Sequence, residues 1–452
     1  MRARREETLT EGPLFRQIVR FSLPLVLSNV LQVLFNMSDI AVVGQFAGAA
    51  ALGSVGSTAI LVTLFTGFLI GMGSGINVIV ARYLGAGRES DVRESVHTAF
   101  LLMAVTGVIL MALGMTLSGP LLRLLGTKEE LIDGAIVYLR LYALGMPGAA
   151  LFNFGSAVLS ARGDTKRPLL FLSSAGVMNV LLNLFFVIVC RMAEAGVALA
   201  SAISQSASAV LIILSLTHRT EAESLRMQHM HLTPAKARQI LSLSIPSGFQ
   251  NAIFAIANLF IQSGVNTFDA LMVEGNSAAA NADGLVYDVM AAIYTACASF
   301  MSQNYGAGKK RRVIRSYFIS MFLAFGVGTA MGVALVIFGR WFLSVFTSDQ
   351  EVITAGMHRL QVMGLSYGFS AFMDCTIAAS RGLGKSVVPT IIVILGSCVF
   401  RVIWVYTVFA HFHTIRSLYL LYIFSWTLTG AAEIVYFAHI WKQKRDLLQK
   451  DA

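Results

Sequence analysis

A carboxylate within an apolar stretch is the first feature of this chain that could do chemistry. Asp39 lies in the sequence Asn36-Met-Ser-Asp39, inside an apolar run that is long enough to cross a bilayer. A charge in such a run costs about 2.5–3.5 kcal/mol on insertion scales, so it marks a functional candidate by default. No cation lies near Asp39 in its own run as a structural partner.

Three further polar residues could combine with Asp39. Asn179 and Asn183 are four residues apart, which puts them on one face of a helix, and Ser201 follows among Ala and Gly residues. A carboxylate with amide and hydroxyl oxygens can hold a sodium ion, and a buried carboxyl can hold a proton. We take these four residues as the candidate cation site. The alternative for the Asn and Ser residues is hydrogen bonding between helices, which is common in membranes.

The second half of the chain has polar candidates of its own. Asp283 and Tyr287 are one helical turn apart. Asp374 lies seven residues before the arginine of an Arg-Gly turn, so it is either functional or a solvated residue at a helix end. Arg140 and Arg359 lie near the outer ends of their runs, and we expect both to snorkel to the interface.

The composition explains where these residues must lie. The 452 residues are only 13% charged, against roughly 25% in a typical globular protein, and the mean hydropathy is +0.71. A soluble surface cannot be built from so few charges, so the sequence predicts an all-α polytopic membrane protein. The four cysteines show no C-x-x-C spacing, which argues against a disulfide framework or a zinc site. The net charge of +10 comes from basic residues at the ends of apolar runs, so we expect no nucleic-acid partner.

Twelve apolar runs are long enough to span a membrane. They cover approximately residues 17–43, 50–80, 97–119, 134–160, 168–190, 194–216, 238–266, 277–302, 314–338, 352–380, 387–410 and 414–440. The first run is too long for a signal-peptide core, so we expect it to remain as the first span. An even number of spans puts both termini on one side, and most of the 34 Lys and Arg residues fall on that side. The positive-inside rule therefore predicts cytoplasmic termini and an inner-membrane location.

The chain also repeats itself. Three pairs of segments match at a nearly constant offset: 18–24 with 240–246, 83–87 with 304–308, and 161–168 with 380–386. Two six-helix lobes follow, at residues 1–216 and 238–452, joined by a cytoplasmic linker at 217–237. Because six is even, we expect a pseudo-two-fold axis along the membrane normal, with a cavity between the lobes. Pro24 and Pro246 repeat on the first helix of each lobe, where a proline permits a bend or hinge.

Two other functions fit the residues poorly. Gly382-Leu-Gly-Lys-Ser386 resembles the end of a phosphate loop, but Ala379 stands where the first glycine is required and no strand precedes it. The eight His residues show no catalytic spacing, so we expect no enzyme activity. A passive channel would need a polar ring repeated in both halves, and Asp39 maps onto Ile261 in the repeat.

Six segments, taken together and in order, resemble the multidrug and toxic compound extrusion (MATE) family of the MOP flippase superfamily. These are 21–24 with 39–44, 80–87, 179–183, 196–201, 245–250 and 303–308. The resemblance covers nearly the whole chain. It implies an antiporter of two lobes that exports cationic or amphipathic drug-like molecules in exchange for protons or sodium. It implies no cofactor beyond the coupling ion, and we expect a monomer.

The resemblance also assigns residues. Asp39 matches the family's acidic residue that binds the coupling cation, and Asn179 and Ser201 match polar members of that site. Asn183 stands where many members have a second aspartate, so the coupling ion, H⁺ or Na⁺, stays open. For the substrate cavity we expect six residues: Asn36, Asn153, Gln250, Asp283, Tyr287 and Asp374.

The alternative function is a lipid or lipid-linked oligosaccharide flippase of the same superfamily. Such proteins commonly carry extra spans and a basic cluster in the cavity. Here the basic residues within spans, apart from those at the span ends, are Arg140, Arg359 and Arg401.

Overall fold

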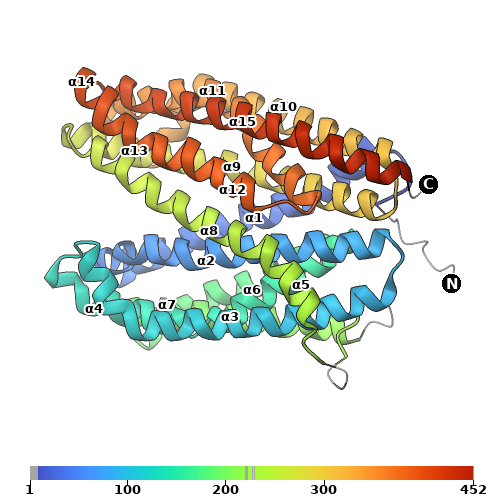
Figure 1. The fold of residues 1–452 in the computed structure, drawn as a ribbon. Coiled ribbons are helices and arrows are strands. Elements are labelled where there is room, and N and C mark those ends of the chain that lie inside the picture. The colour runs from blue at the N-terminus through green and yellow to red at the C-terminus, as the bar shows by residue number, and fades with distance from the viewer. Residues whose placement is uncertain (1–8, 219–221, 227, 229, 451–452) are drawn as a thin grey trace. The chain divides into compact units, whose positions relative to one another are not determined.

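The fold is entirely helical over the part of the chain that the structure, a computed structural model, describes: residues 9–218, 222–226, 228 and 230–450 (Figure 1). The first half contains α1 (Leu14–Phe46), α2 (Ala49–Gly85), α3 (Glu89–Leu124), α4 (Glu129–Ala143), α5 (Met146–Arg162), α6 (Lys166–Leu184), η1 (Phe185–Val189) and α7 (Ala193–Thr217). The second half contains α8 (Pro234–Val265), α9 (Ala270–Gly306), α10 (Lys310–Ser344), α11 (Gln350–Gly382), α12 (Val387–Val393), η3 (Ile394–Val399), α13 (Phe400–Trp404), η4 (Val405–Phe409), α14 (Ala410–Phe412) and α15 (Ile415–Lys450).

The twelve predicted spans are confirmed. Eleven helices are long and apolar enough to cross a membrane, and the twelfth span is the pair α4 and α5, which bends by 44°. Gly145 precedes α5 and Pro147 lies in its first turn, a combination that breaks a helix. The segment from α12 to α14 forms one span that contains the π-helical turns η3 and η4. Several helices, such as α2 and α9, run beyond the predicted apolar ends into polar sequence.

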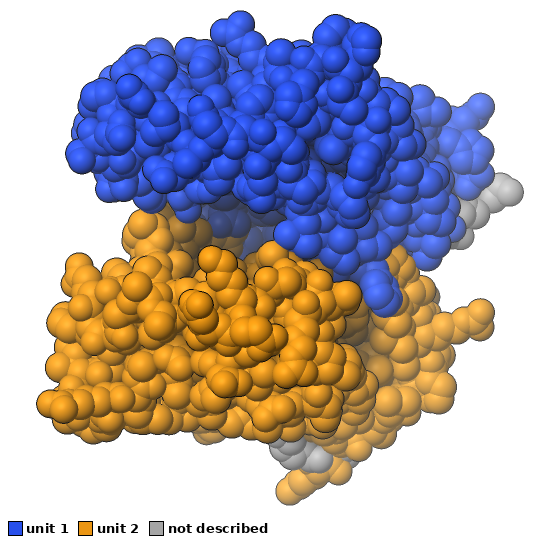
Figure 2. Space-filling view, turned by 90° about the vertical axis from the view of Figure 1, so that its left-hand side faces the viewer, with its two compact units in different colours: residues 1–26, 249–452 blue, residues 27–248 orange. Residues whose placement is uncertain are grey.

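The chain forms two compact units. One comprises residues 27–248 and the other residues 1–26 with 249–452 (Figure 2). The boundaries fall inside α1 and α8, two residues after Pro24 and Pro246. Each of these two helices therefore begins in one unit and ends in the other. The division into lobes at the 217–237 linker stays a prediction.

Close helix contacts hold each unit together. In the 27–248 unit, α5 packs against α2, α3 and α7, and in the other unit α11 packs against α9, α10 and α15. Gly148 is one contact point, because a Cβ there would lie 2.9 Å from the backbone of Ser206 on α7. Small residues at such crossings let helix backbones approach closely, as is typical of membrane helices.

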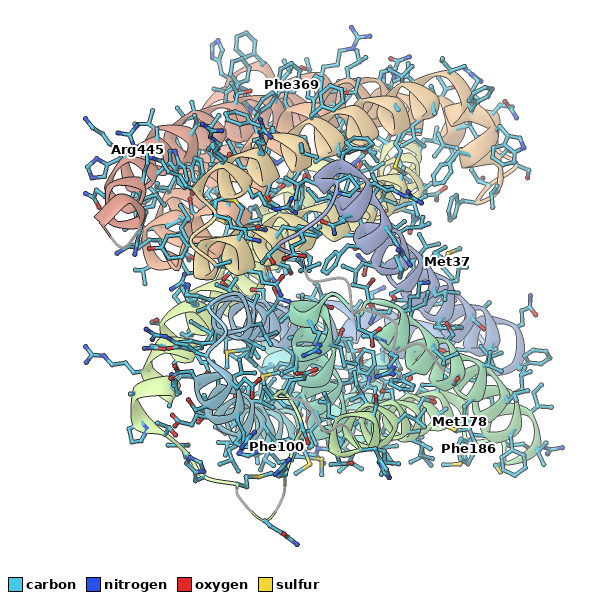
Figure 3. All side chains as sticks on the ribbon, turned by 90° about the vertical axis from the view of Figure 1, so that its right-hand side faces the viewer. Met37, Phe100, Met178, Phe186, Phe369 and Arg445 are labelled. Carbon is cyan, nitrogen blue, oxygen red and sulfur yellow. The ribbon has the colours of Figure 1, made fainter. Side chains whose placement is uncertain are left out.

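The outer surfaces are apolar. Met37 on α1 and Phe369 on α11 are exposed (Figure 3). Trp341 on α10 is 72% exposed. Exposed apolar side chains of this size suit a lipid-facing surface.

The segments that precede α1 and α8 are each fastened within one unit. Arg312 donates to the carbonyl oxygens of Gly12 at 2.8 Å and of Leu9 at 3.3 Å. In the 27–248 unit, the backbone N–H of Thr233 donates to Thr98 Oγ1 at 3.1 Å. These contacts fix where each of the two divided helices starts.

Candidate cation and substrate sites

The four residues of the candidate cation site lie together in the 27–248 unit. The amide of Asn183 donates to Asp39 Oδ1 and, at 3.2 Å, to Asn179 Oδ1. Asn179 Nδ2 donates to Ser201 Oγ at 3.3 Å, and the Ser201 hydroxyl donates to Asp39 Oδ2 at 3.4 Å. The hydrogen bonds close a ring that joins α1, α6 and α7. We call this set the Asp39 ring.

The Asp39 ring has the donor set of a hard cation. Asn179, Asn183 and Ser201 are buried, Asp39 is half-buried, and Asn183 Oδ1 is a buried oxygen without a hydrogen-bond partner among the described residues. Within the same residues, no three His, Cys, Asp or Glu side chains converge as metal ligands. The ring thus offers one carboxylate and neutral oxygens, which suits sodium or a single proton and not zinc.

A glycine brings α1 and α6 close enough to form the ring. A Cβ at Gly176 on α6 would overlap the ring of Phe35 on α1. Phe35 lies one turn before Asp39, and Gly176 lies one turn before Asn179. The close approach therefore aligns the polar residues of the next turn.

Two tyrosines on α4 lie near the carboxylate. Tyr138 and Tyr142 are buried and stacked, with ring centroids 5.9 Å apart, and both interact electrostatically with Asp39. The two tyrosines are therefore buried aromatic neighbours of the Asp39 ring.

Two predicted cavity residues of this unit stay outside the ring. Asn36 is exposed on α1, three residues before Asp39. Asn153 is half-buried on α5 and donates to the carbonyl of Ala149 in its own helix at 2.9 Å. Neither contacts the carboxylate.

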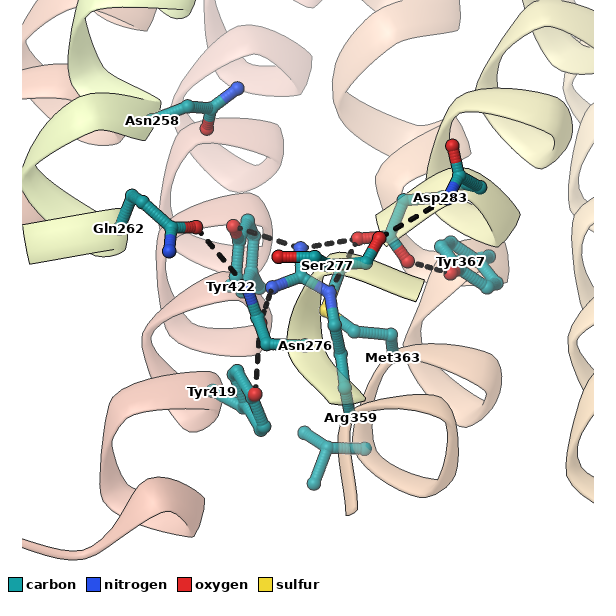
Figure 4. A network of polar contacts seen from close by, with 12 residues as sticks. Asn258, Gln262, Asn276, Ser277, Asp283, Arg359, Met363, Tyr367, Tyr419 and Tyr422 are labelled. Carbon is teal, nitrogen blue, oxygen red and sulfur yellow. Dashed lines mark hydrogen bonds and ion pairs between the residues drawn. The ribbon is translucent and has the colours of Figure 1, made fainter. Parts of the chain in front are cut away.

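Asp283 in the other unit is already paired. Its Oδ2 forms an ion pair with Arg359, and its Oδ1 accepts from the hydroxyl of Tyr367 (Figure 4). Arg359 is only 6% exposed, so the expectation that it snorkels is wrong, because the carboxylate on α9 draws the guanidinium inward. Arg140 is exposed and donates to Ser118 Oγ at 3.2 Å, as a residue near a helix end can.

The ion pair sits in a larger network. Arg359 Nη1 donates to Asn276 Oδ1 at 2.7 Å, and Tyr419 donates to the same oxygen at 2.9 Å. Asn276 in turn donates to Gln262 Oε1 at 3.2 Å, and Arg359 Nη2 donates to Tyr422 at 3.3 Å (Figure 4). Asp283 is therefore part of a neutralised buried network rather than a free negative charge for a cationic substrate.

The remaining predicted cavity residues lie apart from this pair. Tyr287 is 51% exposed, and no hydrogen bond joins it to Asp283 in the described chain. Gln250 is buried, and its Oε1 accepts from Arg381 and Thr390, each at 3.5 Å. Asp374 is half-buried and interacts electrostatically with Arg401 and Arg381.

Sequence reasoning missed a buried carboxylate, Glu433 on α15. It is fully buried, and neither carboxylate oxygen has a hydrogen-bond partner among the described residues. Its electrostatic neighbours are Arg381 and Asp374. The signal was available, since Glu433 is an acidic residue inside the predicted 414–440 span and such charges are functional candidates.

Known proteins resemble this chain over most of its length. It is 29% identical over 362 residues to the probable multidrug resistance protein YpnP of Bacillus subtilis, covering 80% of each protein. It is 26% identical to the probable multidrug resistance protein NorM of Thermotoga maritima, covering 83% of this chain and 82% of that one. The outward-facing structure of a multidrug resistance MATE family transporter of the MOP superfamily matches with a TM-score of 0.90 at 20% identity. That match covers 99% of this chain and 100% of that one.

The family model called MatE matches twice, at residues 24–185 and 246–407. The interval between the two matches equals the interval between the similar segments 18–24 and 240–246, so the internal duplication predicted from the sequence is confirmed. The family consists of transporters rather than enzymes. The chain is a multi-pass membrane protein that belongs to the MatE family.

Proposed function

We propose that this protein is a secondary active multidrug efflux antiporter. It exports cationic and amphipathic small molecules in exchange for protons or sodium by alternating access. Relatives that bear the name multidrug resistance protein support the efflux function. The Asp39 ring is the observation that carries the antiport mechanism.

In this mechanism the coupling cation binds at Asp39. With the carboxylate ionised, the outward-facing protein captures a cation from outside. Binding neutralises the charge, α1 repacks at Pro24, and the altered cavity loses affinity for the drug, which leaves outward. The protein returns with the cation bound. The cation must bind the two states with different affinities, because a ligand that binds both equally shifts nothing.

The single carboxylate leaves both cations available. One proton or one sodium ion would neutralise the ring completely, and the oxygens of Asn179, Asn183 and Ser201 could complete a sodium shell. Asn183 Oδ1 has no hydrogen-bond partner among the described residues. This free oxygen supports the binding of a cation that takes oxygen ligands, or of a group that donates a proton. Cytoplasmic termini, an inner-membrane location and a monomeric state complete the proposal.

The test is transport of a fluorescent cationic dye into energised everted vesicles. We compare the wild type with Asp39→Asn, and with Asp133→Asn as a control that removes an exposed carboxylate from the same unit. Sodium is present or replaced by potassium, and a protonophore is added or omitted. Transport lost with Asp39→Asn and with the protonophore, but indifferent to sodium, identifies a proton antiporter, whereas sodium dependence identifies the other ion.

The contrary result is equally clear. Full transport by Asp39→Asn would show that the ring does not couple. If no cationic dye is transported and Asp39→Asn has no effect, the lipid flippase becomes the better assignment.

A further inference from the structure

An arginine lies near the middle of a membrane span in the unit formed by residues 1–26 and 249–452. The span runs from Val387 at the start of α12 to Phe412 at the end of α14, and Arg401 lies just past its midpoint. At a rise of about 1.5 Å per residue, Arg401 lies about 21 Å from Val387 along the helix. Arg401 is only 3% exposed. A cation at this depth is costly, and its retention calls for a function.

The partners of Arg401 are all uncharged. Its Nε donates to Ser425 Oγ at 3.3 Å, and its Nη1 donates to Asn258 Oδ1 at 3.4 Å. The guanidinium also lies over the rings of Tyr422, at 4.8 Å from the centroid, and Phe254, at 5.6 Å. Both hydrogen bonds are longer than the usual range of about 2.7–3.2 Å, and Nη2 makes none within the described chain. Arg401 therefore has hydrogen-bonding capacity to spare.

The nearby carboxylates do not pair with Arg401. Asp283 is bound by Arg359, whose guanidinium lies 5.3 Å from the centroid of the same Tyr422 ring. Asp374 attracts Arg401 electrostatically but forms no ion pair with it in the described chain, and it also interacts with Arg381. Two guanidinium groups thus share one tyrosine ring, and no carboxylate among the described residues contacts the one on Arg401.

We propose that Arg401, with Ser425, Asn258 and the face of Tyr422, binds an anionic group, a carboxylate or a phosphate, on a transported amphipathic substrate. The planar guanidinium can bind such a group in a bidentate fashion and exchange two long hydrogen bonds to neutral oxygens for shorter ones to an anion. Phe254, which is half-buried, offers apolar surface for the rest of the molecule. Asn258 is exposed, so the guanidinium lies one side chain below the surface of its unit.

The depth of Arg401 favours a substrate over a lipid headgroup. Headgroups lie at the membrane interface, whereas transporter substrates bind near the bilayer midplane. This inference rests on the proposed efflux function and narrows it, because the substrates would include zwitterions and amphipathic anions as well as cations.

Two dyes that differ only in a carboxylate test whether Arg401 binds an anionic group. Rhodamine 110 has a free carboxylate, and rhodamine 123 is its methyl ester. We measure binding of both to the purified protein in lipid nanodiscs by fluorescence anisotropy, so that the result does not depend on transport. Arg401→Gln should weaken rhodamine 110 binding by about 10- to 100-fold, the effect of a lost charge-assisted bond, and change rhodamine 123 binding less than about twofold. Arg401→Lys should retain part of the preference.

Asn258→Asp provides a second variant, since it keeps Arg401 and changes an exposed residue. The introduced carboxylate should form an ion pair with the Arg401 guanidinium and so weaken the binding of rhodamine 110 but not of rhodamine 123. Arg140→Gln, which removes an exposed arginine, is the control and should alter neither dye. Equal loss of both dyes in Arg401→Gln and Asn258→Asp, or no loss of rhodamine 110, would overturn the anion site.

A different result would contradict the proposed efflux function. If wild-type vesicles do not transport rhodamine 123 while Arg401→Gln still loses rhodamine 110 binding selectively, the anion site stands and efflux does not.

Discussion

Two corresponding regions of the duplicated chain have opposite charge. Asn179 and Arg401 each follow a proline near the start of their span, Pro168 and Pro389, by about three helical turns. The π-helical turn η3 before Arg401 accommodates an additional residue in the second span. Asn179 then bonds Ser201 on the next span, and Arg401 likewise bonds Ser425.

The difference lies in what completes each region. In the 27–248 unit the carboxylate of Asp39 closes the ring, whereas buried Ile261 stands at the matching position of the repeat. The corresponding region of the other unit has the guanidinium of Arg401, and no carboxylate of the described chain contacts it. The two regions thus share a frame of helix-to-serine contacts and differ in the charge inside it. In the proposed mechanism, the first region binds the coupling ion and the second binds the substrate.

The largest difference between the two regions should appear in stability. Arg359→Gln or Asp283→Asn removes one partner of a buried ion pair and should lower the free energy of unfolding by about 3–5 kcal/mol. Asp39→Asn leaves no opposite charge uncompensated and should cost less than about 1 kcal/mol. SDS-titration unfolding of the three proteins measures this. Equal losses for Asp39→Asn and Asp283→Asn would show that Asp39 has a structural counter-charge.

The approach of α1 to α6 comes next in size. Gly176→Val would push Phe35 away, cost about 1–3 kcal/mol through overpacking, and separate Asp39 from Asn183. We expect dye transport to fall as it does in Asp39→Asn. Gly56→Val is the matched control, because a Cβ at Gly56 meets nothing within 4 Å. Normal transport in a folded Gly176→Val protein would separate coupling from this helix contact.

A second carboxylate should sharpen the selectivity of the Asp39 ring for cations. Asn183→Asp would give the ring two negative charges, which favours sodium, and sodium affinity should rise about tenfold, the effect of about 1.4 kcal/mol. The sodium dependence of dye transport measures it. An unchanged sodium dependence would mean that the ring does not hold this ion.

The smallest effects should come from the two serines, and they should fall on different ligands. Each substitution removes a hydrogen bond worth about 0.5–1.5 kcal/mol. Ser201→Ala should change the dependence on the coupling ion a few-fold and leave the rhodamine 110 preference intact, and Ser425→Ala should do the reverse. If both substitutions affected the same ligand equally, the two units would not have separate roles in binding the coupling ion and the substrate.

Much of this architecture is predictable from sequence. Apolar runs gave the twelve spans, because length and hydropathy are local properties. The grouping of Asn179 and Asn183 follows from helical spacing, and the in-span position of Asp39 marks it as exceptional. The resemblance supplied the expectation that α1, α6 and α7 contribute to one site.

Contacts between distant helices were harder to predict. Nothing in the spacing shows that Arg359 reaches Asp283, 76 residues earlier, and so it was expected to snorkel. Tyr287 follows Asp283 by one turn, yet Tyr367 from another helix is the tyrosine that bonds the carboxylate. Glu433 differs, because an acidic residue within a predicted span is visible in the sequence alone.

The divided helices make the two halves of the chain mutually dependent. A fragment that ended before the 217–237 linker would lack residues up to 248 that complete its unit, and the remaining fragment would lack residues 1–26 of the other unit. Each half of the chain therefore supplies a segment to the unit of the other half, and two separately produced halves would each leave one unit incomplete.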